Sequence, residues 1–119
     1  MLSAIVGSQY LPSFDGAILF LEDVTELPYR LDRAITTLLV GGHLRGVSGV
    51  VLGQLTDCRP GRDGIRAQDM LQERLAQLDI PIATGLAAGH DLPNHAMVLL
   101  QTARLEANEG SAELSLSPA

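Results

Sequence analysis

Short apolar segments alternate with helix-like patterns over the first two thirds of the chain. The apolar run at 17–21 follows a turn sequence and predicts a buried strand. From Pro28, apolar residues recur at helical spacing until a Gly-Gly pair, which predicts a helix that begins at the proline. Further apolar runs at 47–52 and 81–84 predict two more strands.

A second amphipathic segment follows a loop of glycine and polar residues at 58–64. Its expected buried stripe consists of five apolar residues: Ile65, Met70, Leu71, Leu75 and Leu78. The resulting order is β-α-β-α-β. This order predicts a parallel sheet, because a helix connects each strand to the next.

The last third of the chain has a different pattern. After a loop at 85–94, short apolar segments at 97–100, 103–107 and 112–116 predict three strands. The sequence Asn-Glu-Gly between the last two is a hairpin signal. We therefore expect an antiparallel meander after the parallel sheet, and the length of 119 residues is that of one domain.

Composition narrows the class of protein. Apolar residues make up 46% of the chain and aromatic residues only 3%, so the core must be aliphatic. The net charge of -6 suits nucleic acid poorly as a partner. There is no signal-peptide pattern and no apolar stretch near the roughly 18 residues of a membrane helix, so we expect a cytoplasmic protein. Cys58 is the only cysteine, which excludes an internal disulfide.

Three acidic residues, Glu22, Asp23 and Asp57, lie at or just after predicted strand ends. In α/β sheets, side chains at the carboxyl ends of strands project into a ligand crevice. Glu22 interrupts an apolar strand, so its carboxylate is partly desolvated and needs a hydrogen-bond donor, which an imidazole can supply. A capping or surface carboxylate is the simpler interpretation of the same residue.

His90 lies in the loop 85–94, where small residues would let a substrate or a second domain approach the backbone. The alternative is a loop histidine that makes only a local turn bond. The spacing of His90, Asp91 and His95 fits no strong zinc pattern, and no phosphate-binding glycine motif occurs, so we expect neither metal nor cofactor. No serine lies in a G-x-S-x-G elbow. The residues alone support an α/β domain with a candidate acid–histidine pair.

Four segments resemble the LD-carboxypeptidase family, the muramoyltetrapeptide carboxypeptidases, in the same order and spacing. They are AILFLEDVTELPYRLDR (17–33), GVSGVVLGQLTDC (46–58), DIPIATGLAAGH (79–90) and LPNHAMVLLQTARLEA (92–107). The similarity covers nearly the whole chain, so we interpret residues 1–119 as the C-terminal domain of such a protein. It implies a three-layer β/β/α swivelling domain with a central parallel sheet and a smaller antiparallel sheet.

The resemblance also implies that Glu22 and His90 are the glutamate and histidine of a Ser-Glu-His triad. Enzymes of this family release the terminal D-alanine from murein tetrapeptides during cell-wall recycling in the cytoplasm, and they are commonly homodimers. Their nucleophilic serine belongs to an N-terminal domain that is missing here, so we expect the isolated chain to be inactive. Asp57 is a candidate for recognising the free amine of the peptide.

Two other functions are compatible with the same residues. A sister group of microcin-immunity peptidases is similar in its triad but cleaves peptidyl-nucleotide amides; the short loops and few aromatic residues here favour murein peptides. A non-catalytic binding or assembly domain is the alternative from a different class. Without its covering domain, the chain is also expected to expose apolar surface near Glu22 and His90 and to self-associate.

Overall fold

The computed structural model describes residues 1–117. A short 3-10 helix, η1 (Leu2–Ile5), precedes the first strand. The remaining elements follow in the order β1 (Ile18–Val24), α1 (Pro28–Val40), β2 (Gly49–Thr56), α2 (Ala67–Ala76), β3 (Ile82–Ala83), β4 (Ala103–Asn108) and β5 (Ser111–Leu116). None of the helices within residues 1–117 has the length and apolar character that crossing a bilayer requires.

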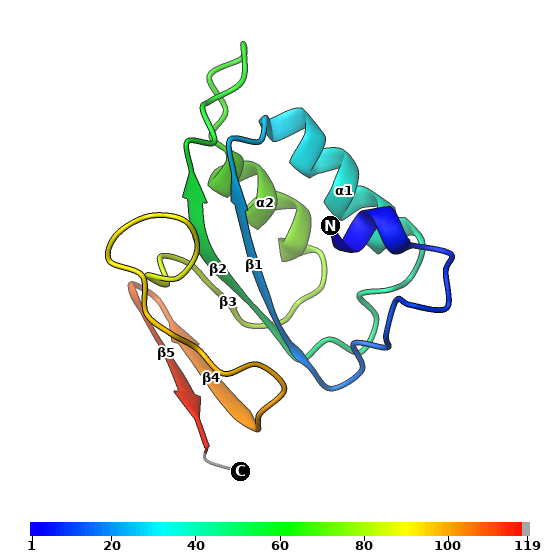
Figure 1. Cartoon of the computed structure of the whole chain (residues 1–119), viewed down its shortest axis with the longest axis vertical. Helices are drawn as coiled ribbons and strands as arrows, with labels where there is room; N and C mark the ends of the chain where they lie inside the picture. The colour runs from blue at the N-terminus through cyan, green and yellow to red at the C-terminus, as the bar shows by residue number, and fades with distance from the viewer. Residues whose placement is uncertain (118–119) are drawn as a thin grey trace.

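A parallel three-stranded sheet in the order β1-β2-β3 forms the centre of the molecule. The two helices that connect its strands, α1 and α2, lie on the same side of the sheet (Figure 1). Pro28 occupies the first turn of α1, where its fixed φ is compatible with the helix. The predicted parallel sheet and the predicted start of the first helix are therefore confirmed.

The aliphatic core lies between the sheet and the helices. Val50 and Leu52 of β2 are both 0% exposed and point towards the helices. The helices contribute the apolar stripes that cover them: Leu31, Ile35 and Leu38 from α1, and Met70, Leu71 and Leu75 from α2. Burying each of these side chains contributes about 1.5–3 kcal/mol, so this layer supplies much of the stability.

The second face of the sheet is covered by the hairpin β4–β5 and by the loop before it. Leu105 of β4 lies over Gly49 of β2, where an added Cβ would be only 2.9 Å from its Cδ2 atom. The hairpin turns at Gly110, whose φ of +82° is one that glycine adopts without strain. Helices, parallel sheet and antiparallel hairpin thus form three layers, and the predicted fold class is confirmed (Figure 1).

One predicted strand is wrong. Residues 97–100 form no strand, and the last three side chains are open to solvent: Val98 is 61% exposed, Leu99 63% and Leu100 107%. Leu100 has a left-handed backbone with φ of +62°, which interrupts an extended segment. The apolar run reflects exposed side chains beside the loop rather than a buried strand, so the meander reduces to a single hairpin.

The limits of two other elements differ from the prediction. Helix α2 begins at Ala67, and Ile65 lies before it with 46% exposure, because the loop folds back so that Gly61 N–H donates to the Ile65 carbonyl. Strand β1 continues to Val24, so Glu22 lies inside the strand rather than at its end. Strand residues therefore flank the carboxylate on both sides.

Candidate functional site

Glu22 and His90 meet on the face of the sheet that the helices leave uncovered. The His90 Nδ1 and Glu22 Oε2 atoms are 2.8 Å apart, although 68 residues separate them in sequence. The carboxylate comes from β1 and the imidazole from the loop between β3 and β4. The fold brings together the two residues that the sequence singled out, and the carboxylate does more than cap a surface.

The geometry assigns different roles to the two imidazole nitrogens. An ionised carboxylate only accepts hydrogen bonds, so the Nδ1 atom carries the proton and donates it to Glu22. The side chains of His90 and Glu22 are 54% and 28% exposed. Within residues 1–117, no protein atom hydrogen-bonds the Nε2 atom of His90. This nitrogen is available as a base on the exposed side of the pair.

The loop that carries His90 is fastened to β2 by backbone hydrogen bonds. Leu86 N–H donates to the Leu52 carbonyl over 3.3 Å, and Gln54 N–H donates to the Ala88 carbonyl over 2.9 Å. Because Ala88 is buried and lies only two residues before His90, the imidazole extends from a segment of backbone that is held in place. The histidine is thus positioned by the sheet even though its ring is half exposed.

A pocket of about 520 Å³ opens beside the pair. Glu22, Asp23 and His90 contribute its polar lining, and Ser3 and Leu99 also border it. Its remaining lining is mostly apolar and comes from η1, β1 and α1, with Leu55 of β2 and Leu71 of α2. A pocket with an apolar wall and a few convergent polar groups is the usual form of a small-molecule site.

Asp57 lies apart from the Glu22–His90 hydrogen bond. It follows the end of β2 with a left-handed backbone, φ of +52°, and an exposed side chain. The neighbouring Cys58 is half-buried, and burial raises the pKa of its thiol. A raised pKa reduces the thiolate fraction at neutral pH, which argues against Cys58 as a nucleophile. Within residues 1–117, no group of three or more His, Cys, Asp or Glu side chains is placed to hold a metal ion.

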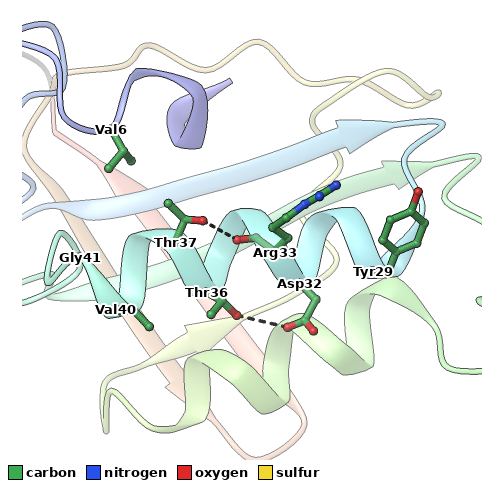
Figure 2. A pocket seen from close by; sticks show the side chains of 8 residues that line it. All are labelled: Val6, Tyr29, Asp32, Arg33, Thr36, Thr37, Val40 and Gly41. Atoms are coloured by element: carbon green, nitrogen blue, oxygen red, sulfur yellow. Dashed lines mark hydrogen bonds between the residues drawn. The ribbon is translucent and has the colours of Figure 1, made fainter.

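Larger hollows exist elsewhere, but their chemistry is different. One of about 620 Å³ lies along the outer face of α1 (Figure 2). There the Thr36 hydroxyl donates to Asp32 over 3.4 Å and the Thr37 hydroxyl donates to the Arg33 carbonyl. Asp32 also receives two hydrogen bonds from Arg74 of α2, which lower the pKa of this carboxyl. Asp32, Thr36 and Thr37, which line this hollow, use their polar groups within or between the helices, so we place the site at Glu22 and His90.

Comparison with known proteins identifies the family of the chain. The family model described as the LD-carboxypeptidase C-terminal domain matches residues 1–105. The chain belongs to this family. The murein tetrapeptide carboxypeptidase of Pseudomonas aeruginosa is 33% identical over 107 residues, which are 90% of this chain and 34% of that protein.

Two solved structures share the fold. The muramoyltetrapeptide carboxypeptidase from Oxalobacter formigenes superimposes with a TM-score of 0.86 and 30% identity, over 99% of this chain and 42% of that one. A microcin C7 self-immunity protein in complex with aspartyl sulfamoyl adenosine gives a TM-score of 0.58 and 30% identity, over 72% of this chain and 26% of that one. The chain spans only about a third of the length of the curated relatives, between 28% and 36% for the first two.

Two amide side chains beside the Glu22–His90 pair were missed by sequence reasoning. Gln54 hydrogen-bonds Asp91 N–H and the Pro93 carbonyl, and Asn94 binds the backbone of Gly89. The pair Gly53-Gln54 interrupts an apolar strand, which is a signal for a bulge or a close backbone approach. Asn94 carries no comparable signal, because an asparagine after a proline is ordinary in a loop.

Proposed function

We propose that this chain supplies the glutamate and histidine of a Ser-Glu-His triad in a serine-type carboxypeptidase. The substrate in this proposal is a murein tetrapeptide, from which the enzyme releases the terminal D-alanine during cell-wall recycling. The 2.8 Å contact between His90 Nδ1 and Glu22 Oε2 is the observation that carries the proposal. An acid that orients the base through one ring nitrogen and leaves the other free is the arrangement that hydroxyl nucleophiles require.

The two side chains have distinct roles in this reaction. His90 Nε2 accepts the serine hydroxyl proton as the serine oxygen attacks the carbonyl carbon of the L,D-peptide bond. It then gives that proton to the amine of the departing D-alanine, and water hydrolyses the acyl-enzyme by the same route. Glu22 holds the ring in the reactive tautomer and stabilises the imidazolium. Asp57, exposed after β2, contributes recognition of a free amine on the peptide.

The nucleophile in this proposal comes from the part of the enzyme that precedes this domain, since the chain corresponds to about a third of its relatives. Exposed apolar side chains near His90, including Leu92 (87%) and Leu99 (63%), are consistent with a surface that a further domain covers. The complete enzyme is proposed to be a cytoplasmic homodimer. The isolated chain is proposed to be inactive, although Ser3 borders the pocket.

The test uses the longer protein that contains this domain and a murein tetrapeptide ending in D-alanine. Glu22→Gln and His90→Gln should each lower kcat by at least about 10³-fold, as loss of a triad member does. Asp57→Asn should instead raise KM. His43→Gln, outside the pocket, is the matched histidine control and should leave kcat unchanged. Full activity of His90→Gln, or turnover by the isolated chain that is abolished by Ser3→Ala, would refute the proposal.

A second candidate is amide hydrolysis of an aminoacyl or peptidyl nucleotide. The superposition on the microcin self-immunity protein favours it, but that match covers 72% of the chain with a TM-score of 0.58. The carboxypeptidase from Oxalobacter formigenes matches 99% with 0.86. Parallel assays of the same enzyme on a tetrapeptide and on a peptidyl-nucleotide amide separate the two. Turnover of neither would favour a non-catalytic binding or assembly domain.

A further inference from the structure

The pairing of β1 with β2 is irregular at the level of Glu22. Leu21 pairs with Leu52, whereas Asp23 pairs with Leu55. One residue of β1, Glu22, therefore faces two residues of β2, Gly53 and Gln54. This is a β-bulge, in which the strand with the extra residue bends and turns a side chain in a new direction.

The bulge turns both of its residues towards the His90 loop. The Leu52 side chain belongs to the core on the helix side, and Leu55 packs at its edge. Between them, Gly53 lies against the Ala88 carbonyl, and Gln54 extends its side chain along the loop. In a regular strand, two successive residues would point to opposite faces, so only the bulge gives the loop both contacts.

The Gln54 amide binds the loop immediately after His90. Its Oε1 atom accepts the Asp91 N–H over 2.9 Å, and its Nε2 atom donates to the Pro93 carbonyl over 2.8 Å. Both halves of the amide are used, one as acceptor and one as donor. A carboxylate in this position could satisfy Asp91 but would present a second acceptor to the Pro93 carbonyl.

Hydrogen bonds also hold Gly89, the residue before His90. Asn94 accepts the Gly89 N–H over 3.2 Å and donates to the Gly89 carbonyl over 2.9 Å. Gly89 has φ of +147°, and a Cβ there would lie 3.0 Å from the Gln54 Cβ and 3.3 Å from Glu22 Oε2. Hydrogen bonds thus restrain the backbone on both sides of the histidine, directly above the carboxylate that it binds.

We infer that Gln54, turned out of β2 by the bulge opposite Glu22, is a positioning residue that holds the His90 loop so that Nδ1 faces Glu22 and Nε2 faces the substrate. It acts through the backbone at Asp91 and Pro93 and touches neither the imidazole nor the carboxylate by a hydrogen bond. The importance of Gln54 for activity rests on the proposed function, whereas its effect on the orientation of the imidazole does not rest on it.

The first test is nuclear magnetic resonance of the His90 ring in this chain, with His90→Gln used to assign the signals. The ¹⁵N shifts distinguish the Nδ1–H tautomer, which the contact with Glu22 selects, from the Nε2–H tautomer. Gln54→Met keeps the length of the side chain and removes both hydrogen bonds. It should shift the tautomer population away from Nδ1–H, whereas the control Gln72→Met on α2 should not.

Gln54→Glu provides a second variant, which keeps the acceptor for Asp91 and loses the donor to Pro93; it should have a smaller effect than Gln54→Met. If either folded variant retains the wild-type tautomer, the inference is overturned.

In the longer enzyme, Gln54→Met should lower kcat about 10–100-fold with KM little changed, as a small displacement of a catalytic group does. Loss of activity in Gln54→Met with an unchanged tautomer also counts against it. Activity that survives His90→Gln refutes the proposed function and leaves the tautomer result standing.

Discussion

Gly53 of the sheet lies against the His90 loop, and Gly53→Ala should push the loop away from the sheet. An added Cβ would lie 2.5 Å from the Ala88 carbonyl oxygen and 2.6 Å from Cε2 of Phe20. Carbon and oxygen atoms rarely approach within about 3.3 Å, so the loop must retreat by roughly 0.8 Å. The same retreat stretches the Gln54 N···Ala88 O hydrogen bond from 2.9 Å to roughly 3.7 Å, beyond a useful length.

The cost follows from these two effects. Inserting a methyl group into packed structure costs about 1–3 kcal/mol, and losing a backbone hydrogen bond costs about 0.5–1.5 kcal/mol. Because the retreat that breaks the bond also relieves part of the clash, we expect a loss of about 2–3 kcal/mol in the free energy of unfolding. This is a large fraction of the stability of a single domain.

Urea unfolding of the chain measures this loss, and Gly49→Ala is the matched control. Gly49 lies on the same strand and the same face, but its nearest neighbour is the flexible end of Leu105 at 2.9 Å, with the next atom at 3.4 Å. Its substitution should cost about 1 kcal/mol or less. Amide resonances of residues 86–94 should shift in Gly53→Ala only. Equal stability of the two variants, with the loop resonances unmoved, would show that the contact is not rigid.

Two further predictions concern ionisable groups outside the site. Hydrogen bonds from Arg74 hold the pKa of Asp32 below its ordinary value of 3.8. The contribution of this ion pair to the free energy of unfolding is therefore complete above that pH and disappears as the pH falls through the lowered pKa of the folded chain. The difference in free energy of unfolding between wild type and Asp32→Asn should therefore shrink as the pH is lowered from about 6 into the acid range; a constant difference would contradict this. Burial raises the pKa of Cys58, so iodoacetamide at about pH 7 should alkylate the folded chain several-fold more slowly than the chain in urea, and equal rates would exclude this environment.

Predictions based on repeated patterns agreed best with the structure. Helix α1 was anticipated because Pro28 marks its start and its buried residues, Leu31, Ile35 and Leu38, recur every three or four positions. The run 97–100 failed because apolar character alone does not say whether another segment covers the side chains. Ile65 failed for a related reason, since a loop that folds back removed it from the helical stripe. The periodicity of apolar residues identifies one face of a helix or strand. Whether another segment packs against that face depends on the tertiary structure.

The candidate site was predictable in its chemical groups but not in their arrangement. Glu22 and His90 were singled out by their place in the pattern and by the family resemblance. Their contact depends on the register between β1 and β2 and on a bulge that displaces one residue of that register. Gln54 escaped notice because an amide in a strand is unremarkable until the bulge turns it towards the loop. The local sequence indicates which residues are candidates for the acid and the base. Their relative position depends on how the strands pair, which the local sequence does not show.

The two faces of β2 have different roles: one packs in the aliphatic core, and the other contacts the loop that carries His90. Leu52 is 0% exposed and packs against the helices, so its substitution would affect the core. Gly53, the next residue, contacts the loop that carries His90, and Gln54 binds that loop beyond the histidine. We therefore expect volume-conserving substitutions of the helix-facing side chains to leave the imidazole in place, because the loop is hydrogen-bonded to β2 and packs on its opposite face. We therefore expect the position of His90 relative to Glu22 to depend on the bulge and the two amides, while the aliphatic layer behind the sheet keeps the strands in place.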